Sequence, residues 1–202
     1  MDLTGKAKEL ADVMKIAYER GLTTGAGGNA SVRVEGGILI TPSGMFKGRL
    51  RAEDMVLIDD RGNVLRGGRP SSEWRMHVRI YRVRDDVGSI LHCHHPLLTG
   101  IANITPLVGG KWAYAPLSED DWTEEARLLL RSVKIVPWVP YGTDDLALVV
   151  SEAMRDSNAV IIKRHGAVVA SSDLWGALSA MDSLVEVFEI YWMRALWSGT
   201  RR

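Results

Sequence analysis

Residues 89–100 read SILHCHHPLLTG, an apolar run that leads directly into three histidines. Successive side chains of a β-strand point to opposite faces of the sheet, so His92 and His94 share one face and Cys93 lies on the other. The apolar character of residues 87–94 predicts a strand buried inside a sheet. At the end of that strand, two imidazoles are expected on one face.

The residues before this strand are predicted to form a helix, two hairpins and a second helix. Thr4 is expected to cap the first helix, and Gly21 stands where a helix often ends in a left-handed residue. Residues 31–41 and 55–67 each contain two short apolar runs joined by a glycine-containing turn, which indicates hairpins. The second helix is predicted to begin near Pro70, because apolar side chains at helical spacing follow it.

The residues after the strand are predicted to alternate between helices and strands as well. Residues 95–104 are predicted to be helical, residues 134–139 to form a strand, and Thr143 to cap another helix. Residues 158–171 indicate two strands on either side of an Arg-His-Gly turn. The last helix is expected to begin at Ser172 or at the aspartate that follows it.

The turns between neighbouring strands decide the fold class. Tight turns connect antiparallel strands, so the sequence predicts an α/β fold in which helices flank a mixed, mostly antiparallel sheet, rather than a doubly wound parallel sheet. With 202 residues and a mass of 22.3 kDa, the chain suits one domain, taken as residues 1–202. Its 46% hydrophobic and 25% charged residues are typical of a soluble globular protein.

The charge balance excludes partners that require a strongly charged surface. Lys plus Arg and Asp plus Glu each number 25, so we expect no binding to nucleic acid or to an anionic membrane surface. The single cysteine cannot form an internal disulfide, and the first residues, MDLTGKAKEL, show no signal-peptide pattern, which indicates a cytoplasmic protein. The most apolar helix, residues 174–197, contains several charged side chains, which argues against a membrane span.

Two imidazoles on one strand face are half of a metal site. A catalytic zinc ion usually takes three protein ligands and keeps one position open. His165 is the best candidate for the third ligand, because a sharp turn between two apolar strands presents its side chain at a sheet edge. The alternative is that His92 and His94 are ordinary hydrogen-bonded histidines in partly buried positions.

The remaining histidines and the cysteine are interpreted as structural residues. His77 lies four residues after Glu73 on the second predicted helix, and its apolar neighbours favour a buried, hydrogen-bonded histidine over a fourth ligand. His95 is expected at the surface or behind the ligands. Cys93 is expected to be a small buried hydrophobic residue.

Three short polar turns could together bind a phosphate group. The sequences GGN at residues 27–29, TPSG at residues 41–44 and PSSE at residues 70–73 offer backbone N–H groups, hydroxyls and an amide. Such groups bind phosphate where no net positive charge attracts it. Ordinary turn and helix-cap chemistry is the alternative for each turn alone. Glu73 could close a capping box, or, beside a metal ion, could remove a proton from a carbon next to a carbonyl.

These motifs resemble those of the class II aldolase family, which includes L-fuculose-1-phosphate aldolase, ribulose-phosphate 4-epimerases and the adducin head domain. The resemblance runs from about residue 5 to residue 195. Its carriers, in chain order, are GGNASVR, TPSG, PSSEWRMH, HCHH, VPYGT and RHG. The resemblance implies a three-layer α/β/α fold around a mostly antiparallel sheet. It also implies a fourfold symmetric homotetramer with active sites at the subunit interfaces.

The resemblance further implies the roles of individual residues. It places a divalent metal ion, typically Zn²⁺, on His92, His94 and His165, with Glu73 as a ligand that leaves the metal and acts as the base when substrate binds. Tyr114 matches a tyrosine that the adjacent subunit supplies to protonate the aldehyde oxygen, and a packed aromatic residue is the alternative. The substrate phosphate is placed against Gly28, Asn29, Ser43, Gly44, Ser71 and Ser72.

From this resemblance we expect a metal-dependent aldolase that cleaves a small ketose 1-phosphate, of the L-fuculose 1-phosphate type. The products would be dihydroxyacetone phosphate and an aldehyde, formed through an enediolate. Members of the epimerase branch generally carry aspartate where this chain has Glu73, so the glutamate favours an aldolase. A 4-epimerase, or a dehydratase or decarboxylase of a related sugar phosphate, is the alternative. A non-catalytic module of the adducin-head type is disfavoured, because the full set of metal-ligating side chains is present.

Overall fold

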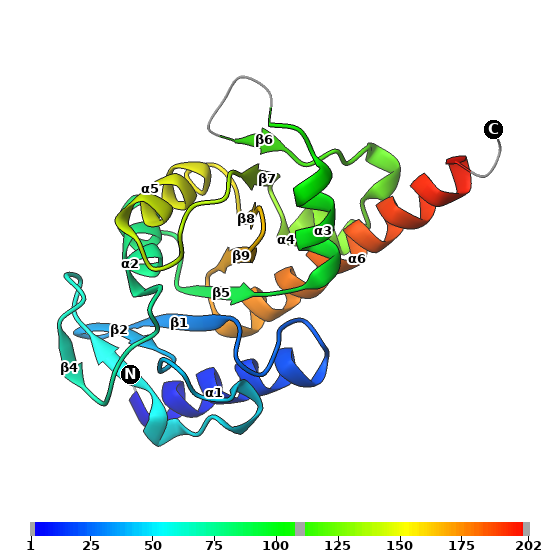
Figure 1. Cartoon of the computed structure of the whole chain (residues 1–202). Coiled ribbons are helices and arrows are strands. Elements are labelled where there is room, and N and C mark those ends of the chain that lie inside the picture. The colour runs from blue at the N-terminus through cyan, green and yellow to red at the C-terminus, as the bar shows by residue number, and fades with distance from the viewer. Residues whose placement is uncertain (1–2, 108–111, 200–202) are drawn as a thin grey trace.

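The computed structural model describes residues 3–107 and 112–199, so residues 1–2, 108–111 and 200–202 lie outside the described part of the predicted domain. Within the described residues, nine strands form one sheet that six α-helices cover (Figure 1). The strands are β1 (Asn29–Val34), β2 (Gly37–Ile40), β3 (Val56–Ile58), β4 (Val64–Arg66), β5 (Ser89–Cys93), β6 (Ala113–Tyr114), β7 (Val133–Val136), β8 (Ala159–Ile162) and β9 (Gly166–Ser171). The helices are α1 (Leu3–Glu19), α2 (Trp74–Val83), α3 (Pro96–Ile104), α4 (Glu124–Leu129), α5 (Asp144–Ala153) and α6 (Leu174–Gly199).

The strand order brings distant parts of the chain together in the middle of the sheet. The order is β4-β3-β2-β1-β5-β9-β8-β7-β6. Every neighbouring pair is antiparallel except β7 and β8, which are parallel and are connected by the crossover helix α5. This confirms the predicted mixed, mostly antiparallel sheet. The strand that carries the histidine pair, β5, lies between β1 and β9.

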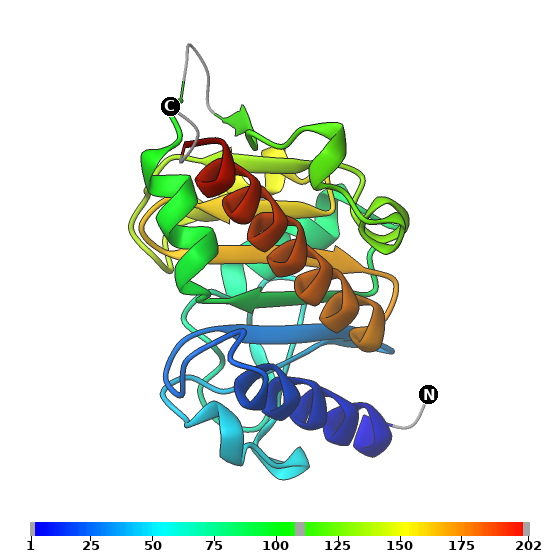
Figure 2. The same ribbon diagram turned by 90° about the vertical axis from the view of Figure 1, so that its right-hand side faces the viewer.

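The helices form a layer on each face of the sheet. One apolar cluster joins the sheet to α1, α3, α4 and α6, and a second joins its other face to α2 and α5. Figure 2 shows α6 running obliquely across one face, with α1 beside it. The predicted three-layer arrangement is therefore confirmed. None of the helices within residues 3–107 and 112–199 combines the length and the apolar character that a membrane-spanning segment needs.

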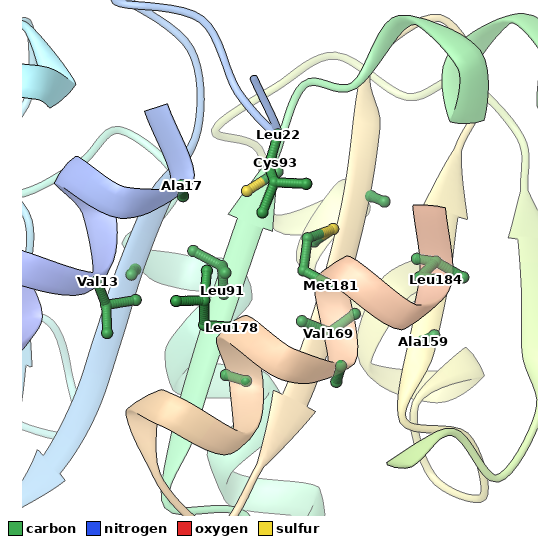
Figure 3. Packing of buried hydrophobic residues seen from close by; sticks show 14 of the residues in the cluster. Val13, Ala17, Leu22, Leu91, Cys93, Ala159, Val169, Leu178, Met181 and Leu184 are labelled. Carbon is green, nitrogen blue, oxygen red and sulfur yellow. The ribbon is translucent and has the colours of Figure 1, made fainter. Parts of the chain in front are cut away.

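The alternation of side chains along β5 fills both apolar clusters. Leu91 and Cys93, both fully buried, belong to the cluster beneath α1 and α6, whereas Ile90 belongs to the opposite one. Figure 3 shows Leu91 next to Leu178 of α6, with Val13 of α1 on the same side of the sheet. Burial of a side chain such as Leu91 stabilises the fold by about 1.5–3 kcal/mol. The interpretation of Cys93 as a buried hydrophobic residue is confirmed.

Most of the predicted elements agree with the structure, one predicted helix cap is wrong, and two short elements were not predicted. The Thr143 side chain accepts a hydrogen bond from the backbone N–H of Leu146 at 3.2 Å, and Gly21 has a φ of +74°, as predicted. The cap at Thr4 was wrong, because α1 already begins at Leu3. Strand β6 and helix α4 were missed because two and six residues are too few to show a hydrophobic period.

Candidate functional site

Four side chains from three separate segments converge at one end of β5. Glu73 is the residue before the first turn of α2, His92 and His94 lie at the end of β5, and His165 lies in the turn between β8 and β9. One ligand atom from each of the four lies within 4.8 Å of all the others. The structure therefore brings together all four residues that were predicted to bind a metal ion.

The distances within this cluster are those of donor atoms that face a common point. The Nε2 atoms of His92 and His94 are 2.9 Å apart, and His92 Nε2 is 3.2 Å from Glu73 Oε2. His165 Nε2 is 3.4 Å from Glu73 Oε1. That carboxylate oxygen is buried and has no hydrogen-bond partner among the described residues. An orphaned carboxylate oxygen among three imidazole nitrogens fits a divalent cation bound in this position.

The pairing of β5 with β9 explains why His165 reaches the histidine pair. His92 pairs with Val168 and Cys93 with Ala167, so the turn that precedes β9 lies against the end of β5. The turn leaves no room for a larger residue at Gly166, where a Cβ atom would stand 2.4 Å from the carbonyl oxygen of Cys93 and 2.9 Å from the His94 ring. Glycine at position 166 is thus required by the close approach of the turn to the end of β5.

A hydrogen bond fixes the orientation of the His92 ring. Its Nδ1 atom donates to the carbonyl oxygen of Ala167 at 2.9 Å, which places the other ring nitrogen, Nε2, toward the cluster. Donation of one ring N–H to a backbone carbonyl is the usual way in which a protein sets the tautomer of a metal-ligating histidine. The backbone of β9 therefore orients Nε2 of His92 toward the other three side chains of the cluster.

The electrostatics of the cluster differ among its four side chains. Burial alone would lower the pKa of His92, but the Glu73 carboxylate and the hydrogen bond to Ala167 outweigh it and raise that pKa, so a metal ion competes with a proton at His92. Burial, together with the charges of neighbouring imidazoles, lowers the pKa of His94 to about 3 and the pKa of His165 to about 4. For Glu73, burial alone would raise the pKa, but His92, His165 and Asn29 outweigh it and hold that pKa well below its usual range. At neutral pH, His94 and His165 are neutral and Glu73 is a carboxylate.

A chain of buried hydrogen bonds holds Glu73 in place from behind. Asn29 Nδ2 donates to Glu73 Oε2 at 2.8 Å, and Asn29 Oδ1 accepts from His77 Nε2 at 2.5 Å. The other ring nitrogen of His77 lies 2.7 Å from Ser31 Oγ, which in turn contacts the Tyr81 hydroxyl at 2.9 Å. His77 is fully buried, so the interpretation of it as a satisfied structural histidine is confirmed. Its place directly behind Asn29 was not foreseen.

The buried neutral state of His77 predicts a pH dependence of stability. Burial lowers the pKa of His77 from 6.5 to about 3, so the unfolded chain takes up a proton there before the folded protein does. The free energy of unfolding of the metal-free protein is expected to be highest above pH 6.5 and to fall as the pH drops toward 3. The contribution of one such histidine is up to about 1.4 kcal/mol per pH unit.

Urea unfolding of the metal-free protein between pH 7 and pH 4.5 measures this slope. The variant His77→Gln lacks the imidazole and should lose the contribution of that one group, although its unfolding free energy at pH 7 is also expected to be lower. If the unfolding free energy falls equally steeply with pH in the wild type and in His77→Gln, His77 is not the group that causes the pH dependence.

The three polar turns predicted to bind phosphate line one cavity beside the histidines. The cavity has a volume of about 270 Å³, and Glu73, His94 and His165 form part of its wall. Gly28 and Gly44 have φ angles of +73° and +75°, a left-handed conformation that favours glycine. All six residues predicted to bind phosphate belong to the lining, namely Gly28, Asn29, Ser43, Gly44, Ser71 and Ser72.

Glu73 does not close a capping box, although the sequence allowed that interpretation. It occupies the N-cap position of α2, but its side chain makes no capping hydrogen bond. Instead, Ser71 Oγ accepts a hydrogen bond from the Glu73 backbone N–H at 3.3 Å. The carboxylate is thereby free to point at the histidine cluster.

Two further residues line the cavity and were not found from the sequence. Lys47 follows the TPSG motif by three residues, and Tyr141 lies within the VPYGT motif. The Lys47 side chain is buried, whereas Tyr141 is 71% exposed. A single lysine after a turn carries no signal of burial in its sequence, so only the packing of the chain could show it.

Tyr114 and His95 lie outside the cavity. Tyr114 is 63% exposed on the edge strand β6 and does not line the cavity of its own chain, so its role in an adjacent subunit stays a prediction. His95 is the N-cap residue of α3 and lines a separate hollow with acidic side chains of α6. This agrees with its predicted place outside the ligand set.

Comparisons with known proteins give a consistent set of relatives. The profile of the family described as Class II Aldolase and Adducin N-terminal domain matches residues 8–192. An L-fuculose phosphate aldolase from Methanococcus maripaludis is 32% identical, over 94% of this chain and 96% of its own. A 5-methylthioribulose-1-phosphate/5-deoxyribulose-1-phosphate aldolase from Rhodospirillum rubrum is 32% identical, over 91% of this chain and 78% of its own.

Other relatives differ in the reaction that they are named for. A 3-oxo-tetronate 4-phosphate decarboxylase from Haemophilus influenzae is 29% identical, over 86% of this chain and 80% of its own. Among solved structures, an L-fuculose 1-phosphate aldolase superposes with a TM-score of 0.84 at 30% identity, covering 96% of this chain and 87% of that one.

Proposed function

This chain belongs to the class II aldolase and adducin family and is an aldolase of the metal-dependent class, and we propose that it cleaves a small ketose 1-phosphate to dihydroxyacetone phosphate and an aldehyde. The observation that carries this proposal is the junction of two sites at the start of α2. Ser71 and Ser72 line the cavity, and the next residue, Glu73, reaches the histidine cluster. A three-carbon keto phosphate bound there would hold its carbonyl carbon and the neighbouring hydroxymethyl carbon beside a carboxylate base.

The residues of the chain divide the chemistry among them. We assign His92, His94 and His165, with Glu73 in the absence of substrate, to a divalent ion that we propose to be Zn²⁺. When bound, such an ion acts as a Lewis acid that polarises the substrate carbonyl. In the condensation direction, the Glu73 carboxylate removes a proton from the carbon next to that carbonyl. In the cleavage direction, the carbon–carbon bond breaks as the hydroxyl group of the departing aldehyde fragment loses its proton, and Glu73 in its protonated form delivers a proton to the carbon that is left behind.

The polar turns bind and orient the substrate in this proposal. Backbone N–H groups of the glycine turns at Gly28 and Gly44, with the hydroxyls of Ser43, Ser71 and Ser72, hold the phosphate. Asn29 serves both functions, because it lines the cavity and donates to Glu73. The carboxylate is thereby kept in one orientation relative to the phosphate.

We also propose that the protein is a homotetramer in which Tyr114 of an adjacent subunit protonates the aldehyde oxygen. The exposure of Tyr114 on the edge strand β6, away from the cavity of its own chain, supports a role in a neighbouring subunit. Light scattering that finds a monomer at assay concentrations would contradict this part of the proposal.

The experiment that tests the proposed reaction is removal and return of the metal. A panel of ketose 1-phosphates, including L-fuculose 1-phosphate and 5-deoxyribulose 1-phosphate, is incubated with the protein, and dihydroxyacetone phosphate is detected with a coupled dehydrogenase. We expect release by the protein loaded with about one Zn²⁺ ion per chain, loss of activity after chelation, and recovery when Zn²⁺ is added back. Undiminished activity in a metal-free preparation would exclude the proposed mechanism.

A decarboxylase is the second candidate, because a relative is named for decarboxylation of a 3-oxo-tetronate 4-phosphate. That reaction also forms a carbanion next to a carbonyl, so the same cluster would serve it. Release of CO₂ from a phosphorylated 3-oxo acid, without release of dihydroxyacetone phosphate from any ketose 1-phosphate, would favour it over the aldolase.

A further inference from the structure

Lys47 is a buried cation that is not paired with any carboxylate within the described residues. Its side chain is only 2% exposed, and its Nζ atom donates to the carbonyl oxygen of Met45 at 2.8 Å. Burial lowers its pKa, and no acidic neighbour opposes that shift. A neutral carbonyl is a weak partner for an ammonium group, which carries three donors and a full charge.

Burial of an ammonium group without a charged partner costs free energy, so we expect Lys47 to have an anionic partner. Lysine is almost never fully buried unless it is paired, and the effective cost of burying one charge is several kcal/mol. The side chain of a lysine at a surface turn could extend into solvent at little cost. In the structure, the Lys47 side chain is instead buried beside the cavity. This burial indicates that an anionic ligand is its partner.

The surroundings of Lys47 show where that anion would lie. Lys47 lines the cavity that contains the three polar turns, and within the described residues it is the only lysine or arginine of that lining. The other donors of the cavity, backbone N–H groups and hydroxyls, are neutral. A phosphate dianion bound to neutral donors alone would have no counter-charge on that side of the cavity.

The turn that carries Lys47 is held in place by its own packing. Lys47 begins the 3-10 helix η1 (Lys47–Arg49), and its backbone N–H donates to the carbonyl oxygen of Gly25 at 2.8 Å. The Phe46 ring packs edge-on against Tyr18 with 4.9 Å between centroids, and it covers Gly25 so closely that a Cβ atom there would be 2.3 Å away. The ammonium group is thus positioned before any ligand binds, which lowers the entropic cost of binding.

We propose that the Lys47 ammonium group is the counter-charge that binds the phosphate dianion of the substrate and makes the site selective for phosphorylated ketoses. This inference rests on the proposed function for the identity of the substrate, but binding of phosphate itself can be measured without any reaction. When phosphate binds, a phosphate oxygen replaces the Met45 carbonyl oxygen as the acceptor for Nζ, or accepts a second hydrogen bond from the same ammonium group.

The test measures the binding of inorganic phosphate to the Zn²⁺-loaded protein by calorimetry. Loss of one partner from a buried, hydrogen-bonded charge pair weakens binding by roughly 30-fold or more, so the Kd of phosphate for Lys47→Met should rise by at least that factor. Lys47→Arg, which keeps the charge, should retain most of the affinity. Arg49→Met is the matched control, because it removes one positive charge from the exposed side of the same turn.

Thermal unfolding supplies a second measurement on the same proteins. Without phosphate, Lys47→Met should be at least as stable as the wild type, because an unpaired buried charge has been removed. With phosphate at saturating concentration, the Tm of the wild type and of Arg49→Met should rise, and the Tm of Lys47→Met should not. If Lys47→Met does not fold, the NMR shift of the Lys47 Nζ resonance in the wild type on addition of phosphate decides the question.

The possible outcomes separate this inference from the proposed reaction. Phosphate affinity that is unchanged in Lys47→Met, or a Lys47 Nζ resonance that does not respond to phosphate, would overturn the role of Lys47 even if aldolase activity is found. A Lys47-dependent phosphate site in a protein that cleaves no ketose 1-phosphate would support Lys47 and contradict the reaction. For an active phosphorylated ketose, kcat/KM should fall in Lys47→Met by the same factor as the affinity for inorganic phosphate. For the unphosphorylated form of the same ketose, kcat/KM should not change.

Discussion

Replacement of His92 by alanine should abolish metal binding and reduce activity by roughly 1,000-fold or more, because loss of the Lewis acid removes several kcal/mol of transition-state stabilisation. His92 is the centre of the cluster. Its Nε2 atom is 2.9 Å from His94 Nε2 and 3.2 Å from Glu73 Oε2, and its other nitrogen is anchored to β9. The two remaining imidazoles, His94 directly after β5 and His165 in the turn between β8 and β9, would form an incomplete site.

Metal content by atomic emission and the rate of dihydroxyacetone phosphate release test this prediction together. The matched control is His95→Ala, which removes the same type of side chain three residues further along the chain, outside the cavity. His95→Ala should bind about one ion per chain and stay active. Full metal occupancy in folded His92→Ala would show that the four-residue cluster is not the metal site. Circular dichroism of both variants confirms that they are folded.

Replacement of Glu73 by glutamine should lower kcat by roughly 100-fold to 10,000-fold, the usual contribution of a general base, while the metal stays bound. Glutamine has the size of glutamate and its side-chain oxygen can still accept the hydrogen bond from Asn29, but it cannot accept a proton from carbon. The three histidines are unchanged, and three protein ligands are sufficient for a catalytic zinc ion. Metal and phosphate binding should therefore persist, which separates loss of chemistry from loss of binding.

Exchange of a carbon-bound proton is the most direct measurement for Glu73. The wild type should exchange one hydrogen of dihydroxyacetone phosphate with deuterium from D₂O, as followed by proton NMR, and Glu73→Gln should do so at a rate reduced by the same factor as kcat. Glu124→Gln provides the control, because Glu124 is an exposed glutamate in the first turn of α4. Exchange at the wild-type rate in Glu73→Gln would assign the base to another residue.

Much of the candidate site could be predicted because its residues belong to short local motifs. The two-residue period of a strand places His92 and His94 on one face whatever the rest of the fold is. Ser71 and Ser72 directly precede Glu73 in the chain. The distance between the phosphate-binding hydroxyls and the carboxylate base is therefore limited by a few covalent bonds. The third ligand, His165, could be proposed from its turn, but no local rule fixes its distance from residues more than 70 positions away.

Other parts of the site depend on contacts that no local pattern contains. The sequence around Lys47 indicates an ordinary surface lysine. Its side chain is buried because Phe46, the residue before it, packs on Tyr18 and Gly25. His77 reads as a core residue of a helix, and it lies behind Asn29 only because β1 pairs with β5 next to α2. Both roles follow from burial, which is a property of the whole fold.

The sequence by itself determined the class of fold, the positions of most helices and strands, and the type of chemistry. These follow from hydrophobic periods, turn residues and local motifs, whose physical causes act over a few residues. The tertiary structure alone decided that Glu73 and the three histidines share one point, that Lys47 has no carboxylate partner within the described residues, and that Tyr114 lies far along the sheet from its own cavity. The physical reason is that distances between segments are set by strand pairing and by side-chain packing, and many sequence-separated contacts must form together before any one of them is fixed.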